Sequence, residues 1–307
     1  MKHWITLATL LLIAGCGDKA ATQPADTTSE PEAAASEPAD DAAATDAVSP
    51  LQAALDAQPE EAQARYTWRH PAETLEFFGI EPGMTVVEGL PGGGWYTKIL
   101  LPYLGRDGTI IGVDYALDMF PLFGFFSEER LEAKKTWTED WVREADGWRG
   151  ENDASVEAFV FGSRDADRFD GRADAVLMVR ALHNLARFES EGGYLTQAMA
   201  DAHAVLKSGG VLGVVQHEAR AEMPDEWAGG QNGYLKRDFV IAAAEAAGFE
   251  FVEASDINAN PADQPTTDDF VWRLPPTLNG ARDNPELRDA MVAIGESNRM
   301  TLKFVKP

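Results

Sequence analysis

From about residue 51 to the C-terminus, short apolar and β-branched runs alternate with segments whose apolar residues recur at helical spacing. The runs predict β-strands at 85–88, 109–113, 156–159, 175–179, 211–215, 250–254 and 300–305. Most of them are apolar almost throughout, which suits strands that helices cover on both faces. The alternation therefore predicts an α/β domain with a mostly parallel sheet.

Helical periodicity is clearest in three segments between these strands, at 96–104, 195–206 and 236–247. The last segment stops before Gly248, and glycine commonly ends helices. Two other segments, 114–155 and 256–298, are longer than connections between strands and helices usually are. Each either covers a pocket or packs onto the edge of the domain. We expect a single domain over residues 51–307.

The N-terminus is typical of a bacterial lipoprotein signal. A basic start and a short apolar run precede Gly15 and Cys16, the only cysteine of the chain. The run is too short to cross about 30 Å of hydrocarbon, so residues 1–15 are expected to be a signal peptide and not a membrane span. A lone cysteine is also compatible with a free thiol or an intermolecular disulfide. Its place directly after small residues favours lipidation of Cys16.

Residues 16–50 are expected to form a disordered acidic tether behind that lipid. Alanine, acids, threonine, serine and proline dominate this segment, which cannot bury enough surface to offset the entropy of ordering it. We therefore expect a lipoprotein of the cell envelope that faces the periplasm and touches the membrane through its lipid alone. Gly17 replaces the aspartate expected for inner-membrane retention, which favours the outer membrane.

The formal net charge of −25 restricts the class of substrate. A surface this acidic repels phosphate backbones and anionic headgroups, which argues against nucleic acid as a partner. We expect a small-molecule substrate. The sequence carries no signal for the oligomeric state.

A glycine-rich turn follows the first predicted strand. The order is a strand ending at Glu88, glycines at 89 and 92–94, and the start of a helix. Glycines let a backbone approach a ligand closely, and the helix start offers free N–H groups. Asp114 closes the second strand, where a carboxylate accepts the hydroxyls of a ribose in nucleotide sites. Glu88 would repel a pyrophosphate but attract an ammonium group, which favours S-adenosylmethionine over a nicotinamide cofactor.

With these motifs the chain resembles the class I S-adenosylmethionine-dependent methyltransferases, and in particular an uncharacterised bacterial family of predicted methyltransferases with exported members. The segments that carry the resemblance are 69–73, 91–97, 259–261 and 296–307. It implies a Rossmann-like, seven-stranded, mostly parallel sheet with helices on both faces and an antiparallel last strand.

The resemblance also implies roles for individual residues. Glu88, Gly92 and Gly94 would contact the methionine end of S-adenosylmethionine, Asp114 its ribose and Asp165, after the third strand, its adenine. One residue departs from the pattern, because Leu90 stands where the family has its first glycine. This departure puts the shape of the methionine pocket in doubt.

His183 is the candidate catalytic residue. It follows the fourth strand, and in this fold the residues there face the transferred methyl group. A histidine is suited to take a proton from the methyl acceptor. The alternative is that His183 caps a helix or fills the wall of the cleft. With His217, it lacks the spaced partners of a metal site, so no metal is expected.

Three functions remain open from the sequence alone. The acids and the glycine-rich turn favour a methyltransferase acting on a small molecule or an envelope component. Leu90 and the export signal favour an inactive relative that binds another ligand or a partner protein. Gly92 and Gly94, opening a helix after a strand, are also compatible with a nicotinamide oxidoreductase, against which Glu88 argues.

The lipid anchor gives the first testable prediction. Replacement Cys16→Ser removes the only thiol that could carry a diacylglycerol, so the precursor is expected to stay unlipidated and uncleaved. Labelling with a radioactive fatty acid measures this. A Cys16→Ser chain that still takes up label contradicts the anchor.

Overall fold

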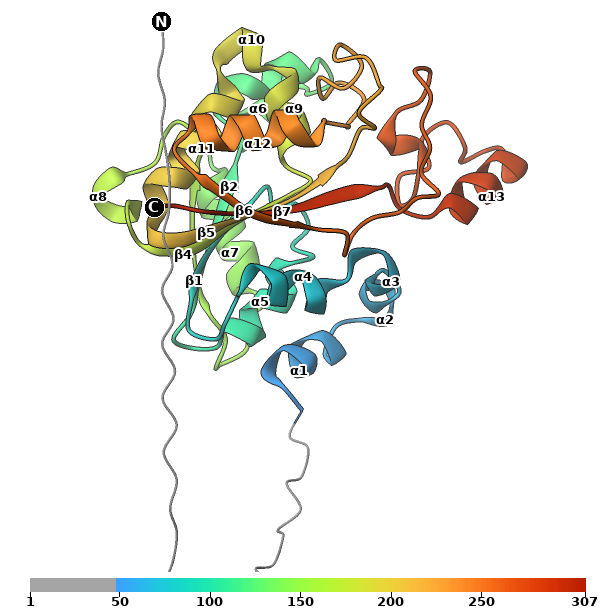
Figure 1. Ribbon diagram of the computed structural model, residues 1–307. Helices are drawn as coiled ribbons and strands as arrows, with labels where there is room; N and C mark the ends of the chain where they lie inside the picture. Colours follow the sequence, from blue (N-terminus) through green and yellow to red (C-terminus); the bar gives the residue numbers. More distant parts are fainter. Residues whose placement is uncertain (1–47) are drawn as a thin grey trace, which may run out of the picture. The chain divides into compact units, whose positions relative to one another are not determined.

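A seven-stranded sheet forms the centre of the structure, a computed structural model that describes residues 48–307 (Figure 1). The strands run in the order β3-β2-β1-β4-β5-β7-β6. They are β1 (Thr85–Gly89), β2 (Thr109–Asp114), β3 (Ser155–Val160), β4 (Ala173–Val179), β5 (Leu206–His217), β6 (Glu250–Ser255) and β7 (Arg299–Val305). Only β7 is antiparallel to its neighbours. This order and the reversed strand confirm the expected Rossmann-like methyltransferase fold.

Helices cover both faces of the sheet (Figure 1). One face packs against α1 (Pro50–Asp56), α4 (Pro71–Phe78), α5 (Thr97–Leu104) and α7 (Trp137–Asp146), and the other against α9 (Leu182–Arg187), α11 (Tyr194–Val205) and α12 (Arg237–Ala246). Side chains of a strand alternate between faces, and accordingly Val86 lies in the core under α5 and Val87 in the core under α9. Burial on both sides explains why the central strands are apolar almost throughout, whereas the edge strand β6 is exposed.

Short helices complete the connections. They are α2 (Glu60–Gln63), α3 (Tyr66–Arg69), η1 (Leu117–Phe123), α6 (Glu128–Lys134), α8 (Ala166–Phe169), α10 (Glu189–Gly192), η2 (Val271–Arg273) and α13 (Pro285–Ile294). The strand order reverses between β1 and β4, which lie side by side although they are far apart in the chain. In open parallel sheets a crevice forms outside the carboxyl ends of the strands at such a point.

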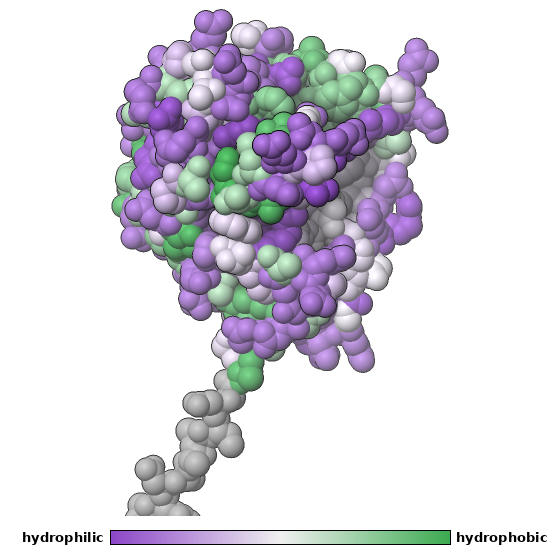
Figure 2. Space-filling model, turned by 90° about the vertical axis from the view of Figure 1, so that its right-hand side faces the viewer, coloured by the Kyte–Doolittle hydropathy of each residue, from purple (hydrophilic) through white to green (hydrophobic). Residues whose placement is uncertain are grey.

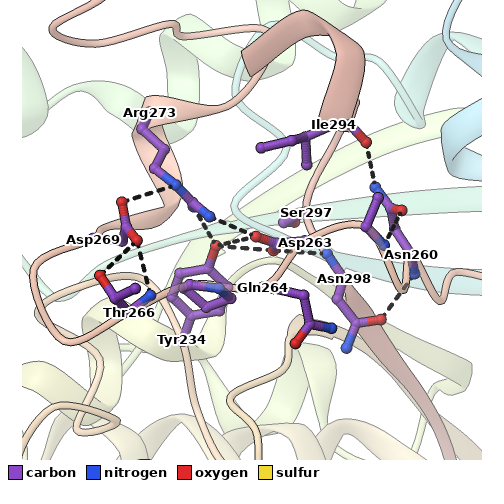
Figure 3. A network of polar contacts seen from close by, with 12 residues as sticks. Tyr234, Asn260, Asp263, Gln264, Thr266, Asp269, Arg273, Ile294, Ser297 and Asn298 are labelled. Atoms are coloured by element: carbon purple, nitrogen blue, oxygen red, sulfur yellow. Dashed lines mark hydrogen bonds and ion pairs between the residues drawn. The ribbon is translucent and has the colours of Figure 1, made fainter. Parts of the chain in front are cut away.

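The segment between β6 and β7 closes that crevice from one side, and we call residues 256–298 the cap. A buried polar network holds the cap in place (Figure 3). Asp263 accepts hydrogen bonds from the Tyr234 hydroxyl at 2.9 Å and from the backbone N–H of Asn298 at 3.0 Å, and it pairs with Arg273 at 2.9 Å. The Asp263 side chain is fully buried, so these partners replace all of its water.

A second part of the network ties the two ends of the cap together. The Asn260 side chain donates to the backbone oxygens of Ile294 at 2.8 Å and Glu296 at 2.6 Å, while the Asn260 backbone donates to Asn298 at 2.8 Å (Figure 3). The cap contains no strand, so side-chain hydrogen bonds hold it in place instead of the backbone hydrogen bonds of a sheet. Ordered loops of this length usually have a function.

Most expectations for the elements are confirmed. All seven strands and the helices α5, α11 and α12 lie where the sequence predicts them. The helices that the sequence did not predict include α7, inside the long segment 114–155, and α13, inside 256–298, although Asn284 caps α13 and Pro285 begins it. Helix α1 begins at Pro50, the last residue of the expected tether. The expected signal peptide, Cys16 and the rest of the tether up to residue 47 lie outside the described residues.

No helix within residues 48–307 combines the length and the apolar character needed to cross a membrane.

The cap network gives a prediction about stability. Replacement Asp263→Ala leaves Arg273 without its buried partner and is expected to lower the free energy of unfolding by about 3 kcal/mol. The matched control Asp269→Ala removes a carboxylate that also pairs with Arg273 but is 32 % exposed, so its effect should be about 1 kcal/mol or less. Urea unfolding measures both, and equal losses would contradict the role of burial.

Candidate functional site

The glycine-rich turn after β1 has the backbone of a ligand-binding loop. Leu90 adopts φ 57°, the left-handed conformation that usually requires glycine, and its N–H donates to the Val113 oxygen at 2.7 Å. Gly92 follows with φ 54°. A side chain added at Gly93 would meet no atom within 4 Å, so this side of the loop is bare. Gly94 differs, since a side chain there would collide with Trp148.

Glu88 is buried beneath the loop. The Thr97 hydroxyl donates to its carboxylate at 2.6 Å, and only 5 % of the residue is exposed. Burial raises the pKa of Glu88 to about 7, because the hydrogen bonds from Thr97 only partly offset the loss of water. Near neutral pH this carboxyl group is therefore poised between its neutral and charged forms.

Asp114 ends β2 as expected, but its carboxylate already has partners. It accepts from the Tyr115 backbone at 2.9 Å and forms an ion pair with Lys134 at 2.7 Å. Lys134 belongs to α6, a helix without a buried residue, and its ammonium also lies 4.4 Å from the centre of the Phe120 ring. The acid expected to bind a ribose is thus covered by an exposed helix in this conformation.

Asp165 lies apart from these residues. It is exposed and occupies the N-cap of α8 without a side-chain capping bond. A cavity of about 410 Å³ opens beside the same connection, and its polar lining includes Ser163, Gln197 and Asp118. Ser163 follows β3, the strand after which the adenine contact is expected, and Asp118 follows β2.

Arg180 follows β4 in the same way as Leu90 follows β1. Its backbone is also left-handed, with φ 58°, and its N–H donates to the backbone oxygen of Val215 in β5 at 2.6 Å. Left-handed conformations of residues other than glycine are strained and concentrate at functional sites. Leu90 and Arg180 together line two cavities, of about 240 and 440 Å³, which lie at the carboxyl ends of β1 and β4.

His183, the second residue of α9, lines the smaller of these cavities. The Gln216 amide lies 3.5 Å from its Nδ1, and the His217 and Trp272 rings are centred 5.5 and 5.8 Å away. Burial lowers the pKa of His183 to about 4, and the Arg180 charge contributes. His183 is therefore neutral at neutral pH, and it is a weak base while Arg180 stays uncompensated.

The cap supplies the other wall of the smaller cavity. Trp272, the residues of 274–277, Glu296 and Ser297 line it, and Ser297 lies 2.6 Å from Nδ1 of the buried His217. Sequence reasoning did not single out Arg180, Arg69 or Glu296 as site residues. The available signal was that the segments 69–73 and 296–307 carry the family resemblance.

Among residues 48–307 there is no group of three or more histidines, cysteines or acids that could hold a metal ion.

Comparison with family models and with curated proteins gave no match, so the family suggested by the motifs stays a prediction. Solved structures with a related fold include the 4+2 cyclase SpnF, with 19 % identity over 78 % of this chain and 80 % of that one and a TM-score of 0.45. A SAM-dependent methyltransferase from Aquifex aeolicus is 19 % identical over 66 % of this chain and 93 % of that one, with a TM-score of 0.43. The arsenic(III) S-adenosylmethionine methyltransferase from Chlamydomonas reinhardtii is 16 % identical over 83 % of this chain and 72 % of that one, with a TM-score of 0.41. At these identities the likeness concerns the fold alone.

The buried Glu88 gives a prediction about pH. Its pKa of about 7 in the folded protein exceeds the ordinary 4.5, so the folded state holds the proton more tightly than the unfolded state. The contribution of the protonated Glu88 to the free energy of unfolding is fully present below the pKa of Glu88 in the unfolded chain. It is lost as the pH rises through the folded-state pKa of about 7. Between pH 5 and 8 the wild type should lose about 3 kcal/mol more unfolding free energy than Glu88→Gln. Urea titrations at both pH values measure this, and parallel losses would refute the raised pKa.

Proposed function

We propose that the protein is an S-adenosylmethionine-dependent methyltransferase acting on a small molecule. One observation carries the proposal. The bare, left-handed loop after β1 and the strained Arg180 after β4 line the same cavities at the carboxyl ends of the strands, where the order of the sheet reverses. Ligands of open α/β sheets bind in such a crevice.

The residues around the loop fit the methionine half of this cofactor. Gly92 and Gly93 leave the loop open toward a cavity, and Glu88 beneath it gains a charge when an ammonium group approaches. Leu90 has the left-handed conformation that glycine favours, which supports a loop of the expected kind although the residue departs from the family's pattern.

The adenosyl half fits after one local change. Asp114 has the position and burial of a ribose acceptor, but Lys134 must leave it first. The ion pair is partly exposed, since 26 % of the Lys134 side chain faces solvent, and such pairs contribute about 1 kcal/mol or less. Lys134 therefore competes weakly with the ribose and does not block it.

S-Adenosylmethionine supplies an electrophilic methyl group on its sulfonium sulfur. The chain's contribution is to orient the acceptor in line with that group and to exclude water. The cap covers the cavity with Trp272 and Leu274, which supports the second task. We propose that His183, neutral at neutral pH, takes the proton that the acceptor loses.

We also propose that this activity serves the cell envelope. The support is the signal sequence that ends at Cys16 and the acidic surface, which disfavours nucleic acid as the acceptor. In this proposal the protein faces the periplasm and contacts the membrane, preferably the outer membrane, through its lipid alone. In that case the protein binds S-adenosylmethionine outside the cytoplasm, the compartment in which this cofactor is usually found.

Cofactor binding to two Asp114 variants tests the proposal. Isothermal titration of S-adenosylmethionine into the full-length chain should give micromolar affinity, weakened at least tenfold by Asp114→Ala because the ribose loses its acceptor. Lys134→Met, which frees Asp114, should bind as tightly as the wild type or a fewfold tighter. Wild-type protein without binding at millimolar cofactor would sink the proposal, as would an Asp114→Ala variant with unchanged affinity.

A further inference from the structure

Four arginines gather around a single acid at the edge of the two cavities, in a chain that is otherwise strongly acidic. We call Arg65, Arg69, Arg180 and Arg299 the arginine cluster, and the acid is Glu296. The cluster combines α3 and the turn before it, the end of β4 and the start of β7. Four cations and one carboxylate leave an excess of positive charge at the cavity wall.

Three members of the cluster have partners within the chain. Arg65 donates to Glu296 from Nε at 2.9 Å, and Arg69 from Nε at 3.2 Å to each oxygen. Arg299 lies 3.4 Å from Glu296 and donates to the Trp68 backbone at 2.6 Å. Glu296 is 3 % exposed, and the surrounding arginines lower its pKa although burial opposes this. Its charge is therefore fully engaged by these three residues.

Arg180 is the member left over. Within residues 48–307 it forms no ion pair, and its buried Nε has no hydrogen-bond partner. Burial and the neighbouring Arg299 lower its pKa. Arg180 is half-buried and lines both cavities, and a cation in such a place without a counter-ion is costly. Such an arrangement favours a ligand that brings the missing negative charge.

We propose that Arg180 binds a carboxylate or phosphate group of the methyl acceptor in the cavity beneath the cap. This inference rests on the proposed function for the identity of the ligand as an acceptor, but the anion site itself does not. Arginine is the residue best suited to these groups, since its planar fork donates two parallel hydrogen bonds.

Arg180 lines both cavities, and the smaller one is the candidate acceptor site. The larger cavity is lined by Gly92 and Gly93 of the loop, whereas the smaller contains Arg180, His183 and cap residues but only Leu90 of the loop. Figure 2 looks onto this end of the molecule, where the surface is mostly hydrophilic.

Anion titration of Arg180 variants tests the inference without S-adenosylmethionine. Inorganic phosphate and benzoate are titrated calorimetrically into the full-length chain at low chloride. We expect millimolar or tighter binding of at least one anion to the wild type, weakened at least tenfold in Arg180→Gln and less in Arg180→Lys. Arg143→Gln, which changes an exposed arginine on α7, should bind like the wild type. Equal affinities in Arg180→Gln and the wild type, or no binding of either anion to the wild type, would overturn the site.

The stability of the same variant separates a ligand site from a structural role. Removal of an unpaired, half-buried cation should leave the unfolding midpoint of Arg180→Gln equal to that of the wild type or higher. A structural arginine would give a lower midpoint, and this result would count against the inference.

Two cofactor ligands distinguish the source of the anion. S-Adenosylmethionine carries a carboxylate and 5′-methylthioadenosine does not, so Arg180→Gln should bind both as the wild type does if the acceptor supplies the anion. Selective loss of S-adenosylmethionine affinity would assign Arg180 to the cofactor and overturn the inference. Anion binding without any cofactor binding would instead refute the methyltransferase and keep the anion site.

Discussion

The buried carboxylate of Glu296 is the interaction on which the architecture of the site depends. It joins Arg65 and Arg69, from the first helices of the domain, to Arg299 at the start of the last strand. Its backbone oxygen also accepts from Asn260, so the cap is fastened at the same point. Breaking a buried pair of this kind usually costs about 3–5 kcal/mol, because a charge is left without water or partner. The two ends of the domain and the wall of the cavity therefore form one unit.

The same arrangement explains why the site is strained and charged. Three arginines satisfy Glu296, and Arg180 remains beside them in a left-handed conformation next to the left-handed Leu90. Burial is the main cause of the lowered pKa of His183, and an anion at Arg180 would offset only the smaller contribution of the Arg180 charge. Binding and proton transfer would then be coupled only weakly through this cation.

The sequence predicts the sheet well because burial on both faces forces apolar runs that are easy to recognise, and the reversed last strand followed from the family resemblance. It misses helices inside the two long segments, such as α7 within 114–155 and α13 within 256–298, and α13 buries no residue. At the site, Glu88, Gly92 and Asp114 could be placed from local order along the chain. The ion pair of Asp114 with Lys134, and the meeting of Arg69 with Glu296, join residues far apart in sequence, and no local pattern encodes them.

Hydrogen exchange of the full-length chain with and without S-adenosylhomocysteine tests most directly that the crevice at β1 and β4 holds the cofactor. The account predicts slower exchange in the loop 89–97 and after β2, at 114–118, together with faster exchange in α6 as Lys134 is displaced from Asp114. Unchanged exchange in the loop 89–97 at saturating ligand would contradict the account.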